Sequence, residues 1–185
     1  MYSYTLGGKK GTKQSLVESK DKIVVRTKNA RTLGDAVNTV EGKRSLDNFK
    51  VEMEIPKVDV TVLKLNKDIK DKLATRDEAR SSLKKEEELK FVGRVLSDKE
   101  VDSLVLYTEN IFIKFTDKIK QEVCERIILE NALTIKEKLD NAVNSYFVSA
   151  PENTGLKIFE ISENLLKKIE VELCHPEIIR KKMSK

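Results

Sequence analysis

The sequence predicts an α+β protein made of two successive β-α-β-β-α-β units, each an antiparallel sheet with helices on one face. Hydrophobic residues alternate in short runs such as 49–55 and 111–115, the period of strands. Residues 67–85 and 118–133 space their apolar side chains as helices do. The order of elements is the same in both halves. We therefore expect two tandem ferredoxin-like domains, at 1–100 and 101–185.

The first half begins with a glycine- and lysine-rich lead, and its β runs are rich in β-branched residues. Thr32 stands where the N-cap of the first helix is expected, and Pro56 turns the chain between the two middle strands. The expected elements are the lead at 7–13, an edge strand at 16–18, strands at 22–27, 49–55, 58–65 and 91–96, helices from 32 and at 67–85, and a turn at 97–100.

The second half repeats this order with stronger aromatic content. Pro151 and Pro176 follow apolar runs, and each is expected to end a strand because proline cannot donate to the ladder. Asp140 and Asn141 provide a turn between two strands. The expected elements are strands at 111–115, 134–139, 144–150 and 169–174, and helices at 118–133 and from 155.

Composition excludes several classes of protein. Hydrophobic residues make up 39% and charged residues 36%, but the apolar residues recur in segments, so we expect a folded chain with a charged surface. No stretch approaches the ~20 apolar residues that span a bilayer, so no membrane partner is expected. The first ten residues lack the apolar core of a signal peptide, which favours a cytoplasmic location. Cys124 and Cys174 are expected to be small buried hydrophobes.

The sequence contains few of the residue patterns that catalysis requires. His175 is the one histidine, and no Gly-x-Ser-x-Gly elbow accompanies it. Cys174 and His175 are adjacent and point to opposite faces of a strand, which does not suit zinc. No glycine loop precedes a helix to cradle phosphate. We therefore expect a chain that is not an enzyme by itself and that holds no metal or cofactor.

Two features are compatible with nucleic-acid binding: the net charge is +5, and RNA-recognition modules share the β-α-β-β-α-β plan. Phe112, Tyr146 and Phe147 are the candidate stacking rings. However, no RNP1-like string surrounds them, and the lysines are scattered among 31 acids. Nucleic acid is therefore an unfavoured partner.

The second half resembles the propeptide region of bacterial subtilisin-like (S8 family) serine proteases that carry a ferredoxin-like prodomain. The resemblance rests on strings at 105–115, 133–136, 144–156 and 171–180, with Asn144-Ser-Tyr-Phe-Val-Ser-Ala-Pro among them. The first half is similar to the segment upstream, through 4–9 and 22–27. These strings consist of structural residues and contain no catalytic signature.

The resemblance implies an intramolecular chaperone and inhibitor. Such prodomains pack an open sheet face on the catalytic domain and lay their last residues through the substrate cleft, where an extended segment pairs by β-augmentation. The implied docking face consists of Phe112, Lys114, Tyr146, Phe147 and Glu172. The implied cleft-threading tail runs from Pro176 to the end of the chain, and its contact residues are His175, Pro176, Glu177, Ile178, Ile179 and Arg180.

The sequence departs from the family pattern in two respects. It contains no catalytic Asp, His and Ser in order, so the chain is either a part of a protease precursor or a free-standing inhibitor. Its last six residues are basic, whereas the family favours apolar or neutral residues at the cleavage site. The expected partner is a subtilisin-like catalytic domain, in cis or in trans. The alternatives are a non-catalytic interaction scaffold in bacterial regulation or defence and an RNA-binding pair of modules.

Overall fold

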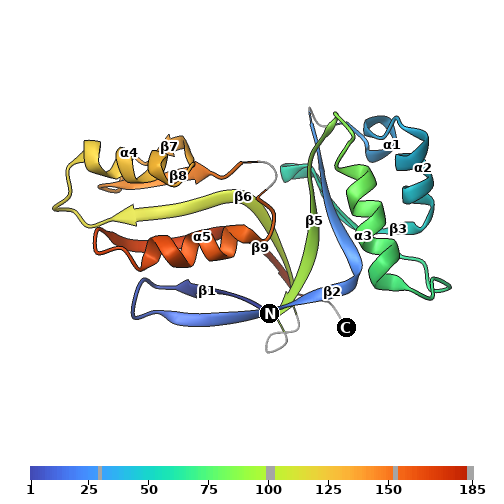
Figure 1. The fold of residues 1–185 in the computed structure, drawn as a ribbon, viewed down its shortest axis with the longest axis horizontal. Helices are drawn as coiled ribbons and strands as arrows, with labels where there is room; N and C mark the ends of the chain where they lie inside the picture. The colour runs from blue at the N-terminus through green and yellow to red at the C-terminus, as the bar shows by residue number, and fades with distance from the viewer. Residues whose placement is uncertain (29–30, 99–102, 152–153, 183–185) are drawn as a thin grey trace. The chain divides into compact units, whose positions relative to one another are not determined.

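The computed structural model describes residues 1–28, 31–98, 103–151 and 154–182, in two compact units. Unit 1 combines Met1–Val17 with Asp98–Lys185, and unit 2 is Glu18–Ser97. Both contain antiparallel strand pairs and helices, which confirms the α+β class (Figure 1). The division differs from a boundary at residue 100 alone, because the first 17 residues belong with the second half.

Unit 2 places its strands in the order β3-β4-β2-β5. Ile23, Val25, Leu63, Leu83 and Leu89 belong to its buried core, over which the helices pack. The bounds are the second part of β2 (Thr12–Thr27), α1 (Leu33–Ala36), α2 (Val40–Asp47), β3 (Phe49–Ile55), η1 (Pro56–Val58), β4 (Val60–Leu65), α3 (Lys72–Leu83) and β5 (Leu89–Asp98).

Unit 1 has the strand order β9-β6-β8-β7, with all three pairings antiparallel. Ile111, Ile113 and Phe115 of β6 are buried beneath the helices, while the residues between them are half-buried on the opposite face. The bounds are β1 (Tyr2–Leu6), the start of β2, β6 (Ser103–Phe115), α4 (Gln121–Glu130), β7 (Thr134–Lys138), β8 (Ser145–Ser149), α5 (Lys157–Leu166) and β9 (Val171–Lys182).

The helix bounds differ from those expected, and each difference has a local cause. Thr32 caps α1 as predicted, but Thr39 caps a second helix, so the segment from 32 is broken in two. Asp71 accepts a hydrogen bond from the Ala74 N–H, and α3 therefore starts five residues later than expected. Helix α4 ends at Glu130, because Ala132 adopts the left-handed region at φ 55°.

The prediction that Pro176 ends the last strand is wrong. β9 continues through Pro176 to Lys182. Pro176 lies opposite Ile111, next to a register shift between β6 and β9, and β9 pairs only with β6 among the described strands. A proline is tolerated at a bulge or in an edge strand, because no ladder hydrogen bond has to come from its nitrogen.

The N-terminal lead is an ordered hairpin. β1 pairs antiparallel with the first part of β2, and the segments expected at 16–18 and 22–27 are one continuous strand. Tyr2, Tyr4 and Tyr107 each place their ring 5.6–6.3 Å from that of Phe159 in α5. This aromatic cluster joins the hairpin to α5 within unit 1. In the described part of the chain, no helix is long and apolar enough to cross a bilayer.

Candidate functional site

The open face of the unit 1 sheet carries three ring side chains in contact. Phe112 of β6 lies between its cross-strand neighbours Phe147 of β8 and His175 of β9. The ring centroids are 5.5 Å apart for Phe112 and Phe147 and 5.4 Å apart for Phe112 and His175. All three are half-buried, on the side of the sheet opposite the buried Ile111 and Ile113. We call Phe112, Phe147 and His175 the ring face.

One side of the ring face ends in an ion pair. Lys114 lies two residues after Phe112 in β6, and its Nζ is 3.0 Å from Glu172 Oε2 and 3.9 Å from Asp117 Oδ1. The hydrogen bond to Glu172 raises the pKa of Lys114, and the negative charges of Glu172 and Asp117 add to the rise. The structure thus brings Lys114 and Glu172 to the edge of the ring face.

A carboxylate network borders the other side, and sequence reasoning did not find it. Glu177 Oε2 accepts hydrogen bonds from Thr108 Oγ1 at 2.6 Å and from Asn110 Nδ2 at 2.8 Å. Lys136 Nζ donates to Asn110 Oδ1 at 3.1 Å. These contacts depend on the register shift between β6 and β9 after Tyr107, which alternation alone does not reveal.

Tyr146 does not belong to this face. It is fully buried on the helix side of β8, opposite Ile113, with its ring 6.0 Å from that of Phe115. Burial raises the pKa of Tyr146 to about 12, and the nearby Cys124 and Glu125 contribute. The reason is the strand period: Tyr146 and Phe147 are consecutive, so one of them must face the helices. Its inclusion in the docking face was wrong.

The expected tail residues occupy strand β9. Ile178, Ile179 and Arg180 pair with Tyr107, Leu106 and Val105 of β6. Arg180 Nη1 lies 2.8 Å from Oδ2 of the buried Asp98, and its Nη2 donates to the Tyr4 hydroxyl at 2.6 Å. The segment 176–182 is therefore part of the sheet, which contradicts its reading as a tail that threads a cleft. Residues 183–185 lie outside the described residues.

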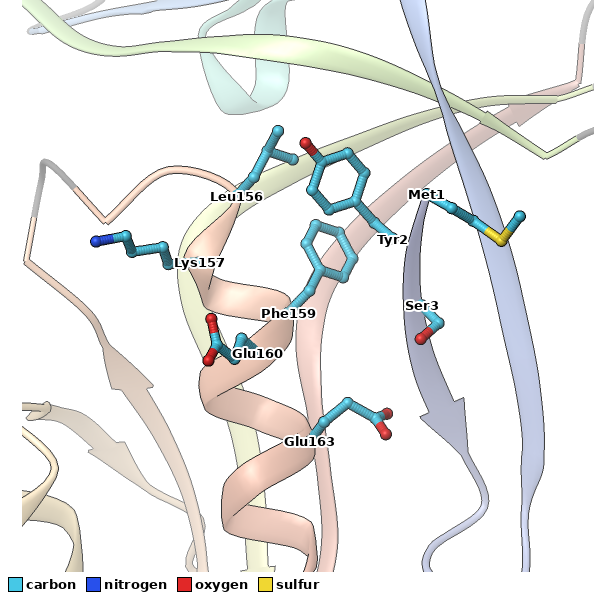
Figure 2. A pocket seen from close by; sticks show the side chains of 8 residues that line it. All are labelled: Met1, Tyr2, Ser3, Leu156, Lys157, Phe159, Glu160 and Glu163. Carbon is cyan, nitrogen blue, oxygen red and sulfur yellow. The ribbon is translucent and has the colours of Figure 1, made fainter.

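A cavity of about 390 Å³ lies elsewhere in unit 1, between β1 and the first half of α5 (Figure 2). The Tyr2 ring lies over that of Phe159, and Glu163 Oε1 accepts a hydrogen bond from Thr5 Oγ1 at 2.9 Å. The lining residues are Met1, Tyr2, Ser3, Leu156, Lys157, Phe159, Glu160 and Glu163. These contacts hold the hairpin on α5.

The described residues do not assemble a metal centre: they contain no group of three or more His, Cys, Asp or Glu side chains placed to hold an ion. Cys124 and Cys174 are free and buried, as expected. Burial raises the pKa of both thiols, which disfavours the reactive thiolate.

No known family model matches the chain. It is similar to two curated proteins named calcium-dependent protease, one from Trichormus variabilis and one from Nostoc, at 41% and 40% identity over 180 residues. Each match covers 94% of this chain but 27% of the relative. The chain thus corresponds to about a quarter of a larger protein named as a protease.

Proposed function

We propose that this chain is a non-catalytic, prodomain-like partner of a subtilisin-like serine protease, which docks by the ring face on the catalytic domain, assists its folding and inhibits it. The ring face carries the proposal. It is a patch of contacting rings, two of them phenyl rings, and its neighbours Lys114, Glu172 and Glu177 already have partners within unit 1. Such a centre with a satisfied polar rim is how protein interfaces concentrate their affinity.

The curated relatives support a role beside a protease. Their matched segment is a minority of each protein, so the remaining length has room for a separate catalytic domain. We also propose that both units are ferredoxin-like. In each unit the first and third strands are central and the second and fourth lie outside, which is the strand order of that fold.

The docking surface consists of Phe112, Phe147, His175, Lys114 and Glu172. Residues 176–182 are left out of the cleft-threading segment, because they already form the second half of strand β9, paired with β6. Any segment that enters the substrate cleft would follow Lys182. The preformed sheet lowers the ordering cost of binding, since its side chains need little rearrangement.

The test is inhibition of a subtilisin-type protease by the intact chain, measured by hydrolysis of a peptide substrate. We expect inhibition in the nanomolar to micromolar range. Phe112→Asp and Phe147→Asp should each weaken it about tenfold or more, because a carboxylate at the centre of a desolvated patch has no partner. Leu129→Asp is the matched control, since Leu129 is 67% exposed on α4, on the helix side of the sheet.

Folding is measured beside inhibition. The intact chain should raise the recovery of active protease after denaturation, and the two ring-face variants should raise it less. Tyrosine fluorescence shows whether a variant still folds, because all four tyrosines lie in unit 1. If the folded wild-type chain neither slows the protease nor aids its recovery, the proposal fails. The alternative, that the chain is an interaction scaffold for another protein, is then favoured.

A further inference from the structure

Four loops meet at one end of unit 1, where β6 ends and β8 and β9 begin (Figure 1). They are the hairpin turn 7–11, the β6–α4 loop 116–120, the β7–β8 turn 139–144 and the α5–β9 loop 167–170. We call this set the loop end. The proposed docking on a protease uses the sheet face and leaves the loop end unassigned.

Hydrogen bonds link the four loops to one another. Lys9 Nζ donates to the Lys168 carbonyl at 2.6 Å, which joins the hairpin turn to the α5–β9 loop. The Thr116 N–H donates to the Glu170 carbonyl at 2.9 Å, which brings in the β6–α4 loop. Asn144 completes the set, since its Nδ2 donates to the carbonyls of Thr116 at 3.1 Å and Ile119 at 2.7 Å.

The loop end presents aliphatic side chains to solvent. Ile169 is 83% exposed and Val143 is 62% exposed, and they flank the end of β6 from two different loops. The same four loops carry six exposed lysines against three carboxylates. The lysines are Lys9, Lys10, Lys118, Lys120, Lys167 and Lys168, and the carboxylates are Asp117, Asp140 and Glu170.

We propose that the loop end docks peripherally on an anionic lipid bilayer. Exposed aliphatic side chains insert among the acyl chains, while lysines around them attract acidic headgroups, and neither feature requires a spanning helix. A nucleic-acid phosphate track would use the lysines but would gain nothing from Ile169 and Val143. The charge complementarity and the two aliphatic side chains together favour the bilayer.

The proposal is tested by co-sedimentation of the intact chain with vesicles of phosphatidylcholine alone and of phosphatidylcholine with phosphatidylserine. We expect binding to the anionic vesicles only, falling as salt rises. The pair Lys118→Glu with Lys168→Glu should weaken binding at least about tenfold, because each lysine near the surface contributes. The pair Lys57→Glu with Lys90→Glu, which changes the net charge equally in unit 2, should weaken it far less.

The aliphatic contribution is tested by Ile169→Ser with Val143→Ser, against Leu129→Ser on α4. The first should lose vesicle binding and the second should keep it, with tyrosine fluorescence showing that all variants fold. Equal binding to neutral and anionic vesicles, no binding at low salt, or equal losses in test and control variants would each overturn the proposal. Tighter binding to a single-stranded RNA homopolymer, lost in the same lysine pair, would overturn it in favour of nucleic acid.

Discussion

Glu86 is a buried acid in unit 2 that organises the start of α2. Its carboxylate accepts hydrogen bonds from the Asn38 N–H at 2.9 Å, the Thr39 N–H at 3.2 Å and the Thr39 hydroxyl. Burial acts to raise the pKa of Glu86. The hydrogen bonds from Thr39 and Asn38 outweigh it, with Lys43 contributing, and the pKa lies below its usual value. The folded state therefore favours the charged carboxylate.

Replacing this carboxylate should destabilise unit 2 in a pH-dependent way. We expect Glu86→Gln to lower the free energy of unfolding by about 1–3 kcal/mol at neutral pH, because buried donors lose a charged acceptor. Because the pKa of Glu86 is lowered in the folded state, the extra stability of the wild type over Glu86→Gln is present above the unfolded-state pKa of about 4.3. It is lost as the pH falls through the folded-state pKa. Thermal unfolding followed by circular dichroism measures it.

The exposed neighbour Glu87 provides the control. Glu87→Gln should change the melting temperature little, both at neutral pH and at acidic pH. A Glu86→Gln protein as stable as the wild type at neutral pH would show that the carboxylate is not important for α2.

Gly42 leaves the space that Glu86 occupies. A Cβ at Gly42 would collide with Glu86 Oε1 and lie 2.7 Å from Val37 Cγ1. Glycine-to-alanine changes inside helices usually stabilise by up to about 1 kcal/mol. We expect Gly42→Ala to destabilise instead, because the carboxylate must move from its donors. Gly34→Ala, where nothing lies within 4 Å, should be neutral or stabilising in the same unfolding measurement.

Strand β9 is anchored beyond Pro176, the residue at which the sequence predicts its end. Arg180 connects its far half to the buried Asp98 and to the hydroxyl of Tyr4. The guanidinium also lies 6.0 Å from the centre of the Tyr4 ring. Arg180 thus links β9 to Asp98 by an ion pair and to the hairpin by its contacts with Tyr4, all within unit 1.

We expect Arg180→Ala to destabilise unit 1 by about 1–3 kcal/mol, less than a fully buried pair would because the arginine side chain is 31% exposed. Urea unfolding followed by tyrosine fluorescence reports on this unit alone, because unit 2 contains no tyrosine. Lys181→Ala, one residue further and exposed, should leave the midpoint nearly unchanged. Equal midpoints for the two variants would contradict the anchoring role.

Elements that follow one dominant local signal could be predicted from sequence. The run 49–55 has the bounds of β3, and Thr32 caps its helix, because alternation and capping are local. The far half of β9 could not be predicted, since the position of Pro176 beside a bulge depends on its partner strand. β1 was not predicted although Tyr2, Tyr4 and Leu6 alternate, because the glycines and lysines that follow them are typical of a loop.

The candidate site was predicted in part for the same reason. Phe112 and Phe147 lie on the open face because alternation fixes which side of a strand a residue takes. By the same alternation Tyr146, the neighbour of Phe147 in β8, lies on the opposite face of the sheet. The prediction that both belong to the docking face therefore conflicted with the strand period. Glu177 contacts Thr108 and Asn110 across the sheet, and that pairing needs the three-dimensional register.

The two proposed surfaces of unit 1 consist of different residues and are physically separable. Two of the three rings in the ring face are apolar, and Lys114 and Glu172 beside them are paired with each other, so its binding should depend little on salt. The loop end relies on exposed lysines, whose attraction to acidic headgroups is screened over about 10 Å at moderate salt. The two surfaces share no residue, which allows variants to affect one without the other.

We therefore expect a double dissociation between the two assays. Phe112→Asp should weaken protease inhibition and leave sedimentation with anionic vesicles unchanged, whereas Ile169→Ser with Val143→Ser should do the reverse. Raising salt in both assays should release the chain from vesicles while inhibition changes by no more than about threefold, because apolar burial is not screened. If one variant impairs both activities while tyrosine fluorescence shows a folded unit 1, the two surfaces act as one.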